Sequence, residues 1–226
     1  MKNQAISEEK RRSVFNVLKG EYVGKRIQPS YLRQEVVLKN NQSNYEFNFA
    51  ELVAAALNAT ERRLRRTDAF KVLGMSLQLL IEETLKPGKG VLITYPNPFQ
   101  VNQVTSAPSA SIPGVAVVSP KDLNAVYNGT ISASVNNDTQ FEYIETRQFL
   151  TVPSTQENSI NDYTETDIAA GMISLEPHLL LNGKNTNKFV LTIPTWNAIA
   201  IQSHKPDWDI KAVLLLDGFH IPGVNS

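Results

Sequence analysis

Three histidines and no cysteine limit the chemistry that this chain of 226 residues can perform. The histidines are His178, His204 and His220, and no two of them form the His-x-His pair that a metal-dependent barrel enzyme uses beside a carboxylate. Without cysteine there is no disulfide framework, thiolate zinc site or cysteine nucleophile. Stability must then come from packing or from subunit contacts.

Ser203, His204 and Asp207 are the residue types of a hydrolytic triad. A nucleophile adjacent to its base would point to the opposite face of a strand, so these residues favour a polar loop. Asp207 and Asp209 flank Trp208, but two carboxylates without further oxygen ligands make a poor calcium site, which favours a solvated loop with a buried tryptophan. The sequence therefore predicts that the protein is not an enzyme, with no catalytic residue, metal, cofactor or small-molecule substrate.

The densest charge is the arginine segment, Arg62–Arg66, in which four of five residues are arginine. Arginine makes bidentate contacts with phosphate, so the segment is a candidate for contact with nucleic acid or lipid headgroups. Flanking Glu61 and Asp68 favour the alternative of ion pairs within or between subunits. No aromatic residues are interleaved with the arginines, which argues against a stacking platform for single strands. The candidate residues are Arg62, Arg63, Arg65 and Arg66.

Charge is distributed unevenly along the chain. Residues 1–71 carry 14 Lys/Arg and 8 Asp/Glu, a net charge of +6, whereas residues 102–226 carry 6 and 12, a net charge of −6. Such polarity is typical of a subunit in an ordered layer, with one surface facing anionic material and the other facing solvent. The first twelve residues are polar and the apolar runs are short, so we expect neither a signal peptide nor a membrane span.

The clearest expected element is an N-terminal helix. Ser7 can cap it, acidic residues occupy its first turn, and Gly20 is placed to end it. The apolar face would consist of Val14, Phe15 and Leu18, and the opposite face of Lys10, Arg11 and Arg12. We expect these three cations, together with the arginine segment, to face anionic material.

From Arg33 onward the pattern is that of strands separated by Asn, Pro and Gly. Because no long helices alternate with these strands, the sequence predicts an all-β fold, an antiparallel sandwich or barrel. The best strand candidates are Gln34–Lys39, Gly90–Tyr95, Thr130–Val135, Phe141–Val152, Lys188–Ile193 and Ile210–Leu216.

Two stretches fit more than one element. Residues 50–57 favour a short helix, and Phe70–Ile81 fits both the helix and the strand period. For the second stretch we favour a strand with Gly74 at a bulge or close approach. Polar residues at 103–111 and 154–166 predict long loops of the kind that make functional or subunit contacts.

Several short motifs, taken in order, resemble a known group of virion proteins. They are Arg66-Thr67-Asp68-Ala69-Phe70, Thr94-Tyr95-Pro96-Asn97-Pro98-Phe99, Tyr127-Asn128-Gly129-Thr130, Phe149-Leu150-Thr151-Val152-Pro153-Ser154-Thr155-Gln156, and Leu181-Asn182-Gly183 before the strand ending Ile193-Pro194. Together they cover about residues 60–220 and resemble the jelly-roll major capsid proteins of small tailless icosahedral bacteriophages with an internal membrane that infect Bacteroidetes.

The resemblance implies a jelly-roll fold, either a compact double jelly roll or a single one. The expected organisation is a basic helical arm over residues 1–30 and a jelly-roll region over 31–226, with a boundary near 100–120 if there are two barrels. It also implies a homotrimer within a larger capsid lattice, contacts with other virion proteins, and an inner surface against membrane or genome. The protein would be made in the host cytoplasm and reside in the virion.

The expected function is thus that of a major capsid protein that assembles into an icosahedral shell. One alternative is another virion component, such as a penton, spike or receptor-binding protein. A second is a carbohydrate-binding β-sandwich, in which Trp196, Trp208 and Tyr127 would supply stacking faces.

Overall fold

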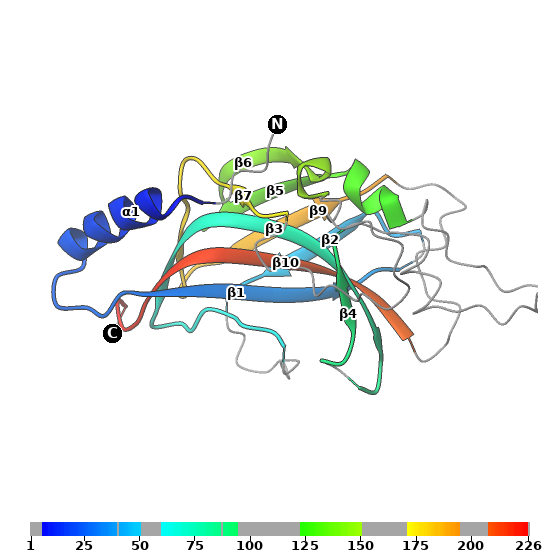
Figure 1. Ribbon diagram of the computed structural model, residues 1–226, viewed down its shortest axis with the longest axis horizontal. Coiled ribbons are helices and arrows are strands. Elements are labelled where there is room, and N and C mark those ends of the chain that lie inside the picture. The colour runs from blue at the N-terminus through cyan, green and yellow to red at the C-terminus, as the bar shows by residue number, and fades with distance from the viewer. Residues whose placement is uncertain are drawn as a thin grey trace, which may run out of the picture.

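The computed structural model describes residues 6–39, 41–50, 60–86, 88–94, 123–150, 171–194 and 208–225. These residues form two antiparallel sheets and one α-helix (Figure 1). The prediction of an all-β sandwich with a short N-terminal helix is confirmed.

The larger sheet has six strands built around one long central strand, β3 (Ala69–Glu83). On one side β3 pairs with β10 (Trp208–Ile221), which pairs in turn with the edge strand β1 (Gln28–Val37). On its other side β3 pairs with three short strands at different positions along its length. These are β4 (Val91–Ile93), β7 (Ile173–Ser174) and β8 (Leu180–Asn182).

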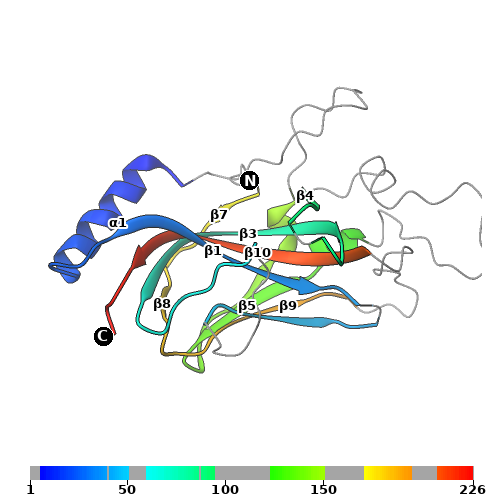
Figure 2. The same ribbon diagram turned by 90° about the horizontal axis from the view of Figure 1, so that it is seen from below.

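The smaller sheet has the order β2-β9-β5-β6. Its strands are β2 (Asn44–Asn48), β9 (Asn187–Thr192), β5 (Thr130–Val135) and β6 (Asp138–Glu145). Two short 3₁₀ helices, η1 (Asn124–Asn128) and η2 (Thr146–Phe149), flank β5 and β6. Figure 2 shows the two sheets as separate layers, with β5 and β9 below β1, β3 and β10.

Strand pairing is nested along the chain. The first strand β1 pairs with the last, β10, and the second strand β2 pairs with β9. Inside these pairs, β3 meets β7 and β8, and β5 meets β6. Strands before residue 50 therefore pair with strands after residue 186, and both halves of the chain build the same two sheets.

The core lies between the sheets because each strand turns alternate apolar residues inward. In β9 these include Phe189 and Leu191, and the ring of Phe49 meets Phe189 edge-on at 5.4 Å between ring centres. One cluster of buried apolar residues extends from Leu32 in β1 to Leu216 in β10. The described strands thus share one continuous core.

Strand β3 carries the irregularity expected at Gly74. Asp217 pairs with Gly74 but Gly218 pairs with Val72, which leaves Leu73 as the extra residue of a bulge. A Cβ at Gly74 would lie 2.6 Å from Ile6 and 2.9 Å from the carbonyl oxygen of Ile173. The prediction of a strand with a bulge or close approach at Gly74 is confirmed.

Helix α1 (Glu8–Glu21) docks on the outer face of the six-stranded sheet, the face turned away from the smaller sheet (Figure 2). The Ser7 side chain accepts a hydrogen bond from the Lys10 N–H, as the capping residue should, and the helix ends one residue after Gly20. Leu18 is buried against Leu73 and Phe219, and Phe15 packs on Phe219.

The strand expectations were confirmed at β1, β4, β5, β9 and β10, although β1 begins earlier, at Gln28. A single strand over Phe141–Val152 is wrong, because the backbone leaves the sheet at Thr146. The Thr146 hydroxyl donates to the Gly129 carbonyl and accepts from the Gly129 N–H, which closes a turn there. Such a turn depends on a residue seventeen positions away.

A solvated loop at Trp208 and Asp209 is also wrong, because both residues belong to β10 and pair with Glu83 and Glu82. The expected loops at 103–111 and 154–166, the helix beyond Ala50, and the 100–120 boundary lie outside the described residues.

Candidate functional site

The arginine segment closes one side of the sandwich. Arg62 pairs through its backbone with Arg33 of edge strand β1, at N···O distances of 2.8 and 2.9 Å. Two residues later, the Leu64 N–H donates to the Phe49 carbonyl next to β2. The segment thereby bridges the edges of both sheets, where unpaired backbone would otherwise be exposed.

Side chains of this segment have different environments. Leu64 is buried in the core, and Arg63 is ion-paired with Glu61. Arg62 lies over the ring of Tyr31, with 5.4 Å between its guanidinium carbon and the ring centre. Arg62, Arg65 and Arg66 are exposed. Only part of the predicted arginine cluster is therefore available to a partner, and sequence inspection missed Tyr31 because it comes from another strand.

Two of the three cations predicted on helix α1 form ion pairs within the chain. Lys10 is ion-paired with Glu176 and donates to the Ser174 hydroxyl, and Arg11 is ion-paired with Asp217 of β10. The prediction that Lys10 and Arg11 lie on the helix face opposite the apolar face is wrong. They precede Val14 and Phe15 by four residues, a spacing that puts side chains on the same helix face.

Arg12 is exposed, with Glu8 one turn away at 3.4 Å as its ion-pair partner. Such an exposed pair contributes little to stability, so Arg12 stays accessible to other anions. Of the N-terminal candidates, Arg12 alone combines high exposure with a weak partner.

A carboxylate near the arginine segment fastens the C-terminal end of the described chain. Asp68 is buried, and it accepts hydrogen bonds from the Gly223 N–H, the Thr67 hydroxyl and the His220 ring. Burial raises the pKa of the Asp68 carboxyl, but the hydrogen bonds from Gly223, Thr67 and His220 outweigh it, and the net direction is downward. Asp68 therefore stays ionised and holds the turn that follows β10.

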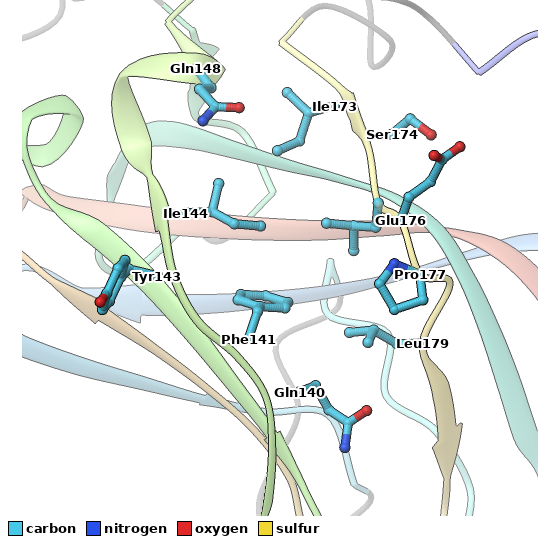
Figure 3. A pocket seen from close by; sticks show the side chains of 11 residues that line it. Gln140, Phe141, Tyr143, Ile144, Gln148, Ile173, Ser174, Glu176, Pro177 and Leu179 are labelled. Atoms are coloured by element: carbon cyan, nitrogen blue, oxygen red, sulfur yellow. The ribbon is translucent and has the colours of Figure 1, made fainter.

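A shallow cleft of about 230 Å³ lies between β6 and residues 173–179 (Figure 3). The side chains of Phe141, Ile144 and Leu179 point into it, and Gln140 and Gln148 lie toward its two ends (Figure 3). β6 pairs with β5 alone among the described strands, and Tyr143 on it is 70% exposed. Ser174 and Glu176 line the cleft beside these apolar side chains.

Ser174 and Lys10 meet beside this cleft at 2.6 Å between Oγ and Nζ. A serine–lysine pair performs acyl transfer when a neutral lysine accepts the serine proton. Here Lys10 is also ion-paired with Glu176, and its hydrogen bond and charge lower the pKa of the Glu176 carboxyl. The ammonium therefore donates to Ser174 and is unsuited to remove its proton.

A buried ion network lies on the outer face of the six-stranded sheet, farther along β10 than α1. The Lys211 ammonium contacts the carboxylates of Glu82 and Glu35, and all three side chains are at most 8% exposed. Burial lowers the pKa of Lys211, but its hydrogen bonds and ion pairs with the two glutamates outweigh this effect and raise it. Arg33, the Thr60 hydroxyl and the Gly88 N–H complete the carboxylates' hydrogen bonding. All these groups satisfy one another, so the network is structural.

The two described histidines belong to separate surroundings. His220 contacts Asp68 and Gln28, whereas the His178 backbone carbonyl accepts from Lys71. His204 lies outside the described residues. Within the described ranges, no group of three or more histidine or carboxylate side chains is arranged to hold a metal, and no helix is long and apolar enough to cross a membrane.

Comparison of the sequence with models of known protein families gave no match, and a search of curated proteins found no similar sequence.

Proposed function

We propose that this chain is a capsid subunit that assembles with copies of itself into the shell of a virus particle. The observation that carries the proposal is the nested strand pairing. When β7 and β8 are taken as one interrupted strand, the sheets have the orders β1-β10-β3-β7/β8 and β2-β9-β5-β6.

We infer that this arrangement is a jelly roll, in which a long antiparallel hairpin is rolled into two sheets of four strands. Of the two forms implied by the resemblance, the single jelly roll is favoured, because β1 and β2 pair with β10 and β9 from the far end of the chain. β4 is then an additional short hairpin beside β3.

Jelly rolls also occur in lectins and cupins, so the site must distinguish these functions. Of the three aromatic residues predicted to stack on a sugar, Tyr127 is 1% exposed and offers no accessible face. Trp196 and the side chain of Trp208 lie outside what the structure describes. A cupin-type centre requires closely spaced histidines, which this sequence lacks.

Shell formation suits the charge distribution and the absence of cysteine. A subunit without disulfides gains stability from neighbours by mass action. The exposed cations Arg12, Arg62, Arg65 and Arg66 would face the anionic interior in this arrangement. We propose a homotrimer as the building unit and virion proteins as the partners.

Electron microscopy and light scattering of the purified full chain test this function. We expect closed shells, or trimers that convert to shells, in the salt of the native particle. A monodisperse 25.1 kDa species at tens of micromolar would contradict the proposal. Isolated pentamers would favour the penton alternative, and binding on a glycan array without assembly would favour the lectin alternative.

A further inference from the structure

Four segments meet at one end of the sandwich, which we call the basic end. It comprises residues 22–27 before β1, 61–68 before β3, 183–186 between β8 and β9, and 222–225 after β10. Both views place the C-terminal segment near the turn between α1 and β1 (Figures 1 and 2).

Backbone contacts fix these segments against one another. The Asn225 N–H donates to the Thr67 carbonyl at 2.9 Å, and the Gly183 N–H donates to the Asp68 carbonyl at 2.9 Å. A Cβ at Gly183 would lie 1.8 Å from the Arg65 carbonyl oxygen, so glycine is required where the segments touch. Lys25 donates to the Gly223 carbonyl and ties in the fourth segment.

Basic residues dominate this end. The four segments hold seven Lys/Arg and two Asp/Glu, a net charge of +5. Both carboxylates are already engaged: Glu61 with Arg63 and the Glu35 N–H, and Asp68 with Gly223, Thr67 and His220. The exposed cations are Lys25, Arg26, Arg62, Arg65, Arg66 and Lys184.

None of these six cations has an ion-pair partner among the described residues. Like charges gathered on fixed backbone repel one another, and an anion with several charges relieves this repulsion. The basic end is therefore suited to a polyanion.

We propose that the basic end binds the phosphate backbone of single-stranded nucleic acid. Five of its seven cations are arginines, whose planar guanidinium groups make bidentate contacts with phosphate. Tyr31, 43% exposed and covered by Arg62, adds an aromatic ring at its border.

The lack of a continuous apolar face disfavours a lipid surface as the partner. An interfacial binder presents a continuous apolar face to the acyl chains. In the described parts of the four segments, Val23 is the exposed large apolar residue, at 82%. An isolated valine among cations fits a phosphate backbone better than a bilayer.

This inference rests on the proposed capsid function only for identifying the nucleic acid as packaged genome. The test is fluorescence anisotropy of labelled oligothymidylate with the purified full chain over a range of salt concentrations. We expect binding that weakens with salt, and about a tenfold or greater loss of affinity in the variant Arg65→Gln, Arg66→Gln, Lys184→Gln. The slope of log affinity against log salt should become shallower by about 2.

The matched control is Lys39→Gln, Lys86→Gln, Lys89→Gln. It removes the same charge from exposed lysines that follow the ends of β1 and β3, away from the basic end. Equal losses in the two variants would show that net charge alone acts, and would overturn the proposal. Should the first variant misfold by circular dichroism, Arg26→Gln must still weaken binding.

Anionic phosphatidylglycerol vesicles serve as the second probe. Binding to vesicles but not to oligothymidylate would overturn the inference in favour of a membrane-facing surface. Shells that form normally while the subunit binds no oligothymidylate would overturn this inference and leave the capsid proposal intact. Oligothymidylate binding without shell formation would support this inference and overturn the capsid proposal.

Discussion

Arg11 on α1 and Asp217 on β10 form an ion pair that joins residues 206 positions apart in the chain. Burial raises the pKa of the Asp217 carboxyl, and the opposing effects of Arg11 and the Gly218 N–H are too small to reverse that shift. Burial thus destabilises the ionised Asp217 carboxylate, and the positive charge of Arg11 offsets part of this effect. It makes α1 a part of the folded subunit rather than a free arm.

Replacing Arg11 tests this role. Arg11→Gln should lower the free energy of unfolding by about 1–2 kcal/mol, since the pair is partly exposed and solvent screens it. Chemical denaturation of the unassembled subunit measures the change. Asp217→Asn in the Arg11→Gln background should restore most of the loss, because it removes the uncompensated carboxylate. Arg12→Gln is the control and should have almost no effect on stability.

Replacing Lys211 should lower the free energy of unfolding far more than replacing an exposed lysine that is also ion-paired with glutamate. Lys211→Met leaves Glu82 buried without a cation and Glu35 with Arg33 alone, and we expect a loss of about 3–5 kcal/mol in unfolding free energy. Lys188→Met breaks the exposed pair with Glu46 and should cost less than about 1 kcal/mol. Similar losses in the two variants, measured by urea denaturation, would contradict the assignment of the Lys211 network as structural.

Local pattern was enough to locate much of the fold. β5 alternates cleanly over Thr130–Val135, and Gly74 marks the bulge in β3, because both signals lie within one segment. Pairing of β1 with β10 joins the two ends of the chain, and no local pattern encodes it. The end of β6 depends on the contact of Thr146 with Gly129 and was missed for the same reason.

The candidate site was predictable in part. The arginine segment was evident from composition, but its division into paired, stacked and exposed side chains arises from Glu61, Tyr31 and the core. Lys184 and Lys25 join Arg65 and Arg66 only through the contacts of Gly183 and Gly223. The helix face of Lys10 and Arg11 was predictable from the sequence, because they precede Val14 and Phe15 by four residues and therefore share a face with them.

His178 should make the folded state sensitive to mild acid. Burial, followed by the charges of Lys10 and Lys71, lowers the pKa of its imidazole below 6.5, while the nearby Glu176 opposes the shift. Between the folded and unfolded pKa values the unfolded chain binds more protons, so stability falls as the pH decreases below about 6.5. Unfolding free energies at a series of pH values should show this fall in the native chain and a smaller one in His178→Gln. A native chain whose stability rises on acidification through this range would contradict the prediction.

Two glycines in different surroundings should respond in opposite directions to the same substitution. A Cβ at Gly218 would lie 1.9 Å from the Lys71 carbonyl oxygen at the β3–β10 bulge, and backbone cannot move away cheaply. Gly218→Ala should therefore destabilise the subunit by about 2 kcal/mol or more. Gly20 lies in the last turn of α1 with no atom within 4 Å of an added Cβ, so Gly20→Ala should stabilise it by about 0.5 kcal/mol through lower chain entropy. Thermal melting of the two variants measures both effects, and a tolerated alanine at Gly218 would show that the bulge register described for β3 and β10 is incorrect.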